Sequence, residues 1–244
     1  MNKVFDDNHR SFGDAFRFLL GVRPGNLGSD TYRHLLLLLF WPLYGIGFYT
    51  FELILPLDFH PIYCVVDDWI PFCEWFVIPY YWWFVILVGM VAYTALFNFE
   101  VYYRYMYFII ITYSVTLLIY LIYPSSQELR PEIFPRDNIL TRIIGTLYAT
   151  DSNENVCPSI HVLGAVGAGI AGLQCRRFAT VWGRIVMWVS IITICMSTVM
   201  IKQHSIIDVF VALALCAVVY PFTFGRKKAF YRPAGQPTAP VAVD

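Results

Sequence analysis

Six apolar segments, each near the length of a membrane-spanning helix, constrain this chain more than any other feature of its sequence. They occupy about 34–56, 75–97, 105–123, 159–174, 183–201 and 205–224. A helix needs roughly 20 apolar residues to cross a bilayer. A chain that is 58% hydrophobic and only 14% charged cannot hide that much apolar surface in a water-soluble core. The sequence therefore predicts an all-α, polytopic membrane protein with six transmembrane helices.

The positions of Lys and Arg predict which side of the membrane each loop faces. With both termini in the cytosol, 13 basic residues fall inside and 4 fall outside. The outer four are Arg130, Arg136, Arg142 and Lys202, and the inner ones are Lys3, Arg10, Arg17, Arg23, Arg33, Arg104, Arg176, Arg177, Arg184, Arg226, Lys227, Lys228 and Arg232. Because cytosolic loops carry an excess of Lys and Arg, this orientation is favoured. It predicts a cytosolic arm at 1–32, one membrane domain at 33–224 and a disordered cytosolic tail at 225–244.

Short apolar patches outside the six segments predict helices on the membrane surface. Residues 15–20 could form such a helix, with a loosely ordered arm as an equal alternative, and 139–148 is expected to form another. In the fourth segment, Gly164, Ala168 and Gly172 recur every four residues, which predicts close helix packing.

The loop before the second segment carries Asp67 and Asp68 without a recognisable motif. They could cap an active site or bind a headgroup, but a solvated acidic loop is the preferred interpretation because most polar residues without a motif lie at the surface. The aromatic run at 80–83 is typical of residues that anchor a helix at the headgroup level. Cys64 and Cys73 share this loop, where a disulfide and two free thiols are both open alternatives.

Three polar clusters stand at the ends of apolar segments, all on the predicted outer side. They are Leu129–Pro131, Cys157–His161 and Ser197–Asp208. If the chain is helical from Ser205 onward, His204 and Asp208 are four residues apart and share one helix face. The carboxylate could then hold one imidazole nitrogen and leave the other free to attack.

The surrounding groups are those that bind phosphate. Arg130 offers a planar fork matched to phosphate oxygens, and Ser159, Thr198 and Lys202 are further donors. Pro158 suits the first turn of the fourth helix, where free backbone N–H groups can bind an anion. His161 would lie within one turn of that anion and could protonate a departing alkoxide. Phosphoryl transfer is therefore the expected chemistry.

The order and separation of these clusters resemble the type 2 phosphatidic acid phosphatase superfamily of membrane lipid phosphatases. The family motifs are Lys-x6-Arg-Pro, Pro-Ser-Gly-His and Ser-Arg-x5-His-x3-Asp, and the resemblance by motif covers about 123–208. It implies that Arg130, Ser159 and Ser197 contact phosphate. It also implies that His161 is the acid, His204 the nucleophile and Asp208 the partner of His204.

The chain departs from these motifs at three positions. Tyr123, Ile160 and Thr198 replace the family's lysine, glycine and arginine, although Lys202 could replace one cation. The run Cys-Pro-Ser-Ile-His-Val is similar to the branch that includes inositol phosphorylceramide synthases. In that branch the phosphoryl group can pass to an alcohol instead of water.

A lipid-phosphate phosphohydrolase at the outer leaflet of the cell membrane is therefore the leading functional hypothesis, with a phosphohistidine intermediate, a lipid phosphate as substrate and no cofactor or metal. Phosphotransfer to an alcohol is the runner-up. A metal-dependent hydrolase with His161, His204 and Asp208 as ligands, and a non-catalytic lipid-binding protein, are further alternatives. No nucleic-acid partner is expected, and the sequence specifies neither the lipid nor the oligomeric state.

Overall fold

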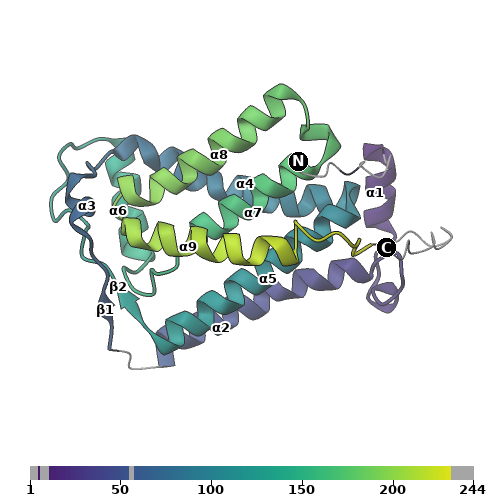
Figure 1. Cartoon of the computed structure of the whole chain (residues 1–244), viewed down its shortest axis with the longest axis horizontal. Coiled ribbons are helices and arrows are strands. Elements are labelled where there is room, and N and C mark those ends of the chain that lie inside the picture. Colours follow the sequence, from purple (N-terminus) through teal and green to yellow (C-terminus); the bar gives the residue numbers. More distant parts are fainter. Residues whose placement is uncertain (1–4, 6–10, 55–57, 232–244) are drawn as a thin grey trace, which may run out of the picture.

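In the computed structural model, which describes residues 5, 11–54 and 58–231, the predicted apolar segments form helices packed into one bundle (Figure 1). The helices at these segments are α2 Phe40–Ile54, α4 Val77–Phe97, α5 Phe99–Ile122, α7 Ile160–Gln174, α8 Val181–Met200 and α9 Ile206–Val219. Three of these α-helices are extended by 3₁₀ helices (η), namely α2 by η2 Arg33–Leu39, α4 by η3 Glu74–Phe76 and α9 by η5 Tyr220–Phe222. The described residues are mostly helical, which confirms the all-α prediction.

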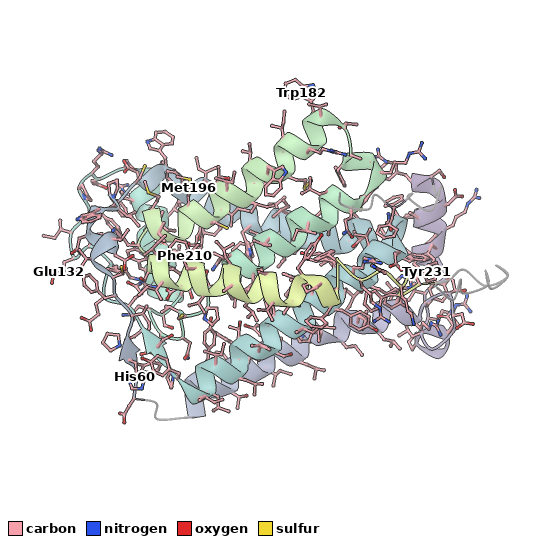
Figure 2. All side chains as sticks on the ribbon, in the orientation of Figure 1. His60, Glu132, Trp182, Met196, Phe210 and Tyr231 are labelled. Carbon is pink, nitrogen blue, oxygen red and sulfur yellow. The ribbon has the colours of Figure 1, made fainter. Side chains whose placement is uncertain are left out.

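Three of these helices are long and apolar enough to cross a membrane. Within the described ranges they span Glu74–Phe97, Phe99–Ile122 and Val181–Met200, with 24, 24 and 20 residues. Helix α7 has only 15 residues, which at 1.5 Å per residue is about 22 Å against a hydrocarbon core of about 30 Å. Apolar side chains such as Trp182, Met196 and Phe210 project from the outer faces of α8 and α9, where they suit contact with lipid (Figure 2).

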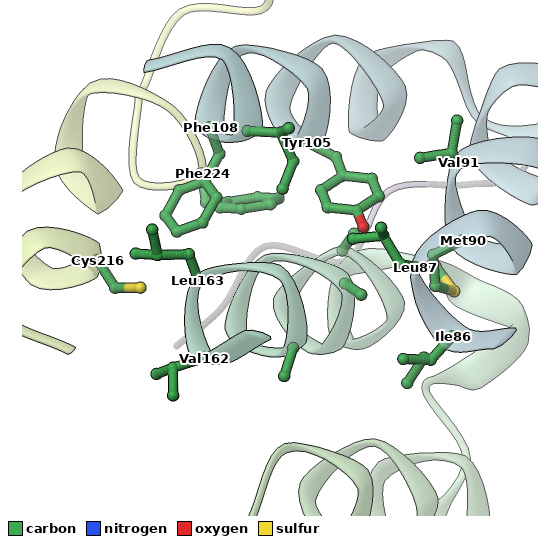
Figure 3. Packing of buried hydrophobic residues seen from close by; sticks show 14 of the residues in the cluster. Ile86, Leu87, Met90, Val91, Tyr105, Phe108, Val162, Leu163, Cys216 and Phe224 are labelled. Carbon is green, nitrogen blue, oxygen red and sulfur yellow. The ribbon is translucent and has the colours of Figure 1, made fainter. Parts of the chain in front are cut away.

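Helix α7 lies at the centre of the bundle and packs against α4, α5, α8 and α9. Its small residues make this possible. A methyl group on Gly164 would approach Trp83 Nε1 to 2.5 Å, and one on Gly172 would approach Met187 Sδ to 2.4 Å. Figure 3 shows Leu163 of α7 among Tyr105 and Phe108 of α5 and other buried apolar residues. The prediction that the small-residue stripe serves close helix packing is confirmed.

The polar loops gather at one end of the bundle (Figure 1). This end carries α3 Val65–Trp69, α6 Ile139–Thr150 and two short parallel strands, β1 His60–Pro61 and β2 Ser125–Ser126. Glu74 connects the start of α4 to the loop that follows α5, because Arg136 Nη1 in that loop donates to both Glu74 carboxylate oxygens at 2.9 and 3.0 Å. The helix predicted at 139–148 forms as α6, beside the loops that follow α5 and α8, and its place on a membrane surface stays a prediction.

The opposite end carries α1 Phe12–Leu20 and residues 225–231 (Figure 1). Ala15 and Phe18 of α1 are buried, so the helical alternative for 15–20 holds over the loosely ordered one. Residues 225–231 of the predicted tail lie within the described residues, and buried Arg104 and Glu100 of α5 form hydrogen bonds with the backbone at Arg226 and Phe230. Composition could not reveal this, since the contacts involve main-chain groups. The rest of the predicted tail lies outside the described residues.

Candidate active site

Two of the three polar clusters meet directly at a small cavity of about 40 Å³ near the loop end of the bundle. This volume suits a few water molecules. The cavity lining consists of Phe48, Tyr120, Asp151, Ser152, Glu154, Asn155, Val156, Ile160, His161, Gln203 and His204. Of the predicted site residues, His161 and His204 belong to this lining, one from the start of α7 and the other from the turn before α9.

His204 is held by Asp208 as the four-residue spacing predicts. His204 Nδ1 lies 3.2 Å from Asp208 Oδ2, and the Asp208 side chain is fully buried in the first turn of α9. The same oxygen accepts from the Ser205 backbone N–H at 3.0 Å. Because a carboxylate can only accept, Nδ1 carries the hydrogen of this bond, and the lone pair of Nε2 stays free to attack.

His161 stands beside His204, with ring centroids 5.8 Å apart. Its ring packs against Tyr80 at 4.4 Å and Trp83 at 4.5 Å between centroids, both from one face of α4. Its Nδ1 is buried with no hydrogen-bond partner in the part of the chain that the structure describes. Sequence reasoning treated Tyr80 and Trp83 as headgroup anchors. That interpretation is wrong for these two, which are 1% and 6% exposed.

Ser159 caps the start of α7 without a side-chain hydrogen bond to the helix. It is fully buried, and its Oγ has no partner among the described residues. The first intrahelical bond runs from Leu163 N to Ser159 O at 3.1 Å. The N–H groups of the first turn therefore lack helical partners, as at every helix start, and Ile160 and His161 of this turn line the cavity. Pro158 precedes the cap instead of standing in the first turn.

Ser197 and Thr198 lie beneath the site. Their hydroxyls donate to carbonyls of their own helix, Ser197 Oγ to Ile194 O at 2.6 Å and Thr198 Oγ1 to Cys195 O at 2.8 Å. The Thr198 carbonyl accepts from the backbone N–H of His204 at 3.0 Å. Neither side chain lines the cavity. In this geometry they shape the turn that presents His204.

Arg130 lies behind the cavity wall. Its Nη2 donates to Asp151 O at 2.8 Å, Ser152 O at 2.9 Å and Gln203 Oε1 at 2.6 Å. Its guanidinium also stacks over the Tyr148 ring, 4.5 Å from the centroid. Burial lowers the pKa of Arg130. The Nη1 and Nη2 groups that the sequence assigns to phosphate thus donate to backbone and amide oxygens, which fixes the loop at 151–152. Nε is buried with no partner among the described residues.

Lys202 turns away from the cavity. Its Nζ donates to Asp67 O at 2.7 Å and to Ile70 O at 2.6 Å. Burial lowers the pKa of Lys202. The structure therefore does not bring this cation to the two histidines, and its visible contacts are with the loop that contains α3.

Asp67 supports the site, although the sequence favours a solvated acidic loop for it. Its side chain is buried, Oδ1 accepts from Ile206 N at 2.8 Å, and Oδ2 accepts from Ser205 Oγ at 2.6 Å. The expectation of a solvated acidic residue is wrong here, although Asp68 is exposed. Asp67 thus secures the start of α9, the helix that carries Asp208. No local pattern signals a contact between residues this far apart in sequence.

The geometry of the described residues bears on two alternatives, a metal site and a disulfide. Across the described ranges, no group of three His, Cys, Asp or Glu side chains is placed to hold a metal ion. The alternative in which His161, His204 and Asp208 bind a metal is therefore not supported by a ligand cluster among the described residues. Of the two alternatives for the outer loop, Cys64 and Cys73 are both free thiols.

Comparison with known proteins adds no family assignment, because no protein-family model, no curated protein and no solved structure matches this chain.

Proposed function

We propose that this protein is a membrane phosphohydrolase that cleaves lipid phosphates through a phosphohistidine on His204. One observation carries the proposal. His204 is bonded to a buried carboxylate, 3.2 Å from Nδ1 to Asp208 Oδ2, while a second histidine lies beside it with 5.8 Å between ring centroids. A nucleophile held by an orienting group, next to a second proton-transfer group, is the arrangement that covalent phosphoryl transfer needs.

The first chemical step would form the phosphohistidine. His204 Nε2 attacks phosphorus, the bond from phosphorus to the lipid oxygen breaks, and His161 gives its proton to the departing alkoxide. Asp208 stabilises the positive charge that develops on the His204 ring. In the second step His161 takes a proton from water, the resulting hydroxide attacks phosphorus, and the bond from nitrogen to phosphorus breaks.

The anionic phosphoryl group would be balanced by the start of α7. The N–H groups of its first turn, which have no helical partner, and the Ser159 hydroxyl, which has no partner among the described residues, would provide donors there. Arg130 would act on the site through the loop at 151–152, which it holds at 2.8 and 2.9 Å. In this scheme no divalent cation takes part, so activity should survive excess chelator.

The membrane arrangement belongs to the same proposal. All six apolar helices would span the bilayer of the cell membrane, with the catalytic cavity on the extracytoplasmic side, as the 13 to 4 split of basic residues favours. The short α7 fits this arrangement, because irregular backbone is tolerated at membrane depth where it lines a cavity. The loop at 151–159, which precedes α7, would occupy the part of the bilayer thickness that this short helix does not reach.

The direct test is phosphate release by the purified protein from phosphatidic acid, phosphatidylglycerol phosphate, isoprenyl diphosphates and sphingolipid phosphates. We expect release that depends on His204 and withstands chelator. Adding an alcohol distinguishes hydrolysis from phosphotransfer, since a phosphorylated alcohol would identify the transferase. No turnover of any lipid would overturn the proposal and favour the non-catalytic lipid-binding alternative.

A further inference from the structure

Helix α1 lies across the end of the bundle that is opposite the candidate active site (Figure 1). One side of this helix packs on the bundle through the buried residues Ala15 and Phe18. The neighbouring side is apolar as well, but each of its side chains is at least 48% exposed. This exposed face of α1 consists of Phe12, Phe16, Leu19 and Leu20. Their three- and four-residue spacing places them on one side of the helix, where they form a continuous apolar surface without a visible cover.

The exposed face of α1 lies where a membrane-crossing helix ends. Phe12 contacts Phe97 with 5.4 Å between ring centroids, and Phe97 is the last residue of a helix long and apolar enough to cross a membrane. Because α1 runs across the bundle, it would lie parallel to a bilayer that the bundle crosses (Figure 1). Trp182 is exposed at the start of α8 (Figure 2), and tryptophan is typical of the membrane–water interface. These features suit a bilayer surface at the level of α1.

The charges at the two ends of the bundle have opposite signs. Among the described residues, ten acidic side chains lie at the loop end with four basic ones, whereas three acidic side chains lie at the α1 end with ten basic ones. The acidic residues at the loop end are Asp58, Asp67, Asp68, Glu74, Glu128, Glu132, Asp137, Asp151, Glu154 and Asp208, and those at the α1 end are Asp14, Asp30 and Glu100. The α1 end is therefore strongly positive.

Most of the positive charge at the α1 end is available to a partner. Two of the basic residues form ion pairs, Arg33 with Asp30 and Arg104 with Glu100. The other eight are all exposed, namely Arg17, Arg23, Arg176, Arg177, Arg184, Arg226, Lys227 and Lys228. Clusters of this size next to membrane-crossing helices favour binding to anionic lipids.

Several of these cations lie close to the exposed face of α1. The Arg177 guanidinium lies over the Phe12 ring, 5.3 Å from its centroid. The cations that precede Tyr231 are held nearby, because the Tyr231 ring contacts Phe99 at 5.3 Å and Phe99 contacts Phe18 of α1 at 6.2 Å between centroids. An apolar helix face beside a group of cations matches the boundary between acyl chains and anionic headgroups.

We propose that the α1 end is a docking surface for a bilayer that contains anionic lipids. The exposed face of α1 would lie among the upper acyl chains, and the eight exposed cations would bind lipid phosphates at the headgroup level. The positive charge selects an anionic partner, and the apolar face selects one with hydrocarbon beneath its charges. The surface is independent of the phosphohistidine function, because it lies at the opposite end of the bundle and takes part in no chemical step.

Lipid competition tests the charge of this surface. The full chain in neutral detergent would be mixed with equal amounts of phosphatidylglycerol and phosphatidylcholine of matched acyl chains, and the retained lipids would be counted by native mass spectrometry. We expect a preference for phosphatidylglycerol that falls as salt rises, because salt screens exposed charges. Arg17→Gln should lower the ratio of the two lipids by about fivefold, the contribution of one cation at a charged membrane surface. Removing Lys227 and Lys228 as well should lower it by about 10²-fold.

The matched control is Arg142→Gln, which removes an exposed arginine at the loop end. It should leave the lipid ratio unchanged. The catalytic cavity is the same in Arg17→Gln and Arg142→Gln, so lipid bound there adds equally to both measurements. Equal retention of the two lipids by the wild type, or an equal loss in the two variants, would overturn the proposed surface.

A depth measurement tests the apolar half of the surface. An environment-sensitive fluorophore on Phe16→Cys, in a folded background without the six native cysteines, would be measured in phosphatidylglycerol nanodiscs. We expect blue-shifted emission and quenching by brominated acyl chains, whereas the same fluorophore on Ile133→Cys, an exposed residue at the loop end, should show neither.

A second variant keeps the native cysteines and so does not depend on that background. Phe16→Asp places a charge on the exposed face of α1 and should lower the ratio of phosphatidylglycerol to phosphatidylcholine by about tenfold, because the carboxylate opposes both the apolar contact and the anionic headgroups. A fluorophore at residue 16 that stays in water, or a ratio unchanged by Phe16→Asp, would overturn the proposal and mean that a protein covers this face instead of lipid.

Discussion

The two ends of the bundle both use a buried carboxylate to hold backbone N–H groups, but they balance its charge differently. At the α1 end, Glu100 Oε2 accepts from the N–H groups of Phe230 and Tyr231, and Glu100 Oε1 pairs with Arg104 Nε at 2.6 Å. At the loop end, the carboxylates of Asp67 and Asp208 accept from N–H groups, a hydroxyl and an imidazole. At the α1 end the carboxylate of Glu100 is paired with the guanidinium of Arg104. At the loop end the carboxylate of Asp208 contacts the imidazole of His204 instead.

This difference separates stability from chemistry. Arg104 Nη1 also donates to the carbonyls of Thr223, Phe224 and Arg226, which gives the ion pair a structural role. Asp208 has a second oxygen, Oδ1, that is buried without a partner among the described residues. Its other oxygen, Oδ2, contacts His204 Nδ1 and is placed to stabilise positive charge on that ring. Substitutions at the loop end should therefore change turnover, and those at the α1 end should change folding.

The largest effect that the comparison predicts is at Asp208. Asp208→Asn should lower turnover by about 10³ to 10⁴-fold, because the amide no longer fixes the His204 tautomer or stabilises its positive charge. Steady-state kinetics with the best lipid substrate measure this loss, and a melting curve checks that the variant is folded. A loss below about tenfold in a folded protein would place Asp208 with the structural carboxylates of the other end.

A smaller effect is expected at Asp67. Asp67→Asn keeps the shape but weakens the bonds to Ser205 Oγ and Ile206 N, so that the start of α9 and the attached His204 are held less firmly. We expect kcat to fall by about tenfold with little change in KM, because bonds to charged groups contribute about 1.5–3 kcal/mol. The pH profile of kcat should shift as well.

The neighbouring Asp68 provides the matched control for this substitution. It is exposed and interacts with the hydroxyl of Tyr63. Asp68→Asn should leave kcat and its pH profile unchanged. Equal effects of the two substitutions would show that loop charge, rather than the contact of Asp67 with α9, affects the reaction.

The smallest effect on turnover is expected at Arg104, with the largest effect on stability. Arg104→Gln leaves Glu100 as an unpaired buried charge, which typically costs about 3–5 kcal/mol. Chemical unfolding in detergent should show this loss, while kcat per folded molecule stays within about twofold of the wild type. A large fall in kcat without loss of stability would mean that the two ends are coupled and that the comparison is wrong.

The sequence predicts the elements better than the contacts between them. The apolar segments locate the helices at 77–97, 99–122 and 181–200 because hydrophobicity is a local property. The pairing of His204 with Asp208 is also local, since it follows from the four-residue spacing on one helix. Both predictions rest on residues that are close in sequence.

The remaining features of the site depend on long-range contacts. Asp67 reaches Ser205 across 138 positions, and Lys202 turns to the α3 loop instead of the cavity. Arg130 finds carbonyls at 151 and 152 that compete with phosphate for its donors. A residue type specifies which partners are possible, whereas the fold determines which of them is nearest. The same limit applies to Tyr80, whose aromatic ring suits both a headgroup anchor and the wall behind His161.

The most direct test of the central claim is to locate the phosphate on the enzyme. Wild type, His204→Ala and His161→Ala would be incubated with a radioactive lipid phosphate, quenched in base and mapped by mass spectrometry. The account predicts acid-labile, base-stable label on His204, none in His204→Ala, and accumulation in His161→Ala with an activated ester such as p-nitrophenyl phosphate, because water then lacks its general base. Label on His161, or label unchanged in His204→Ala, would contradict the assignment of the two histidines.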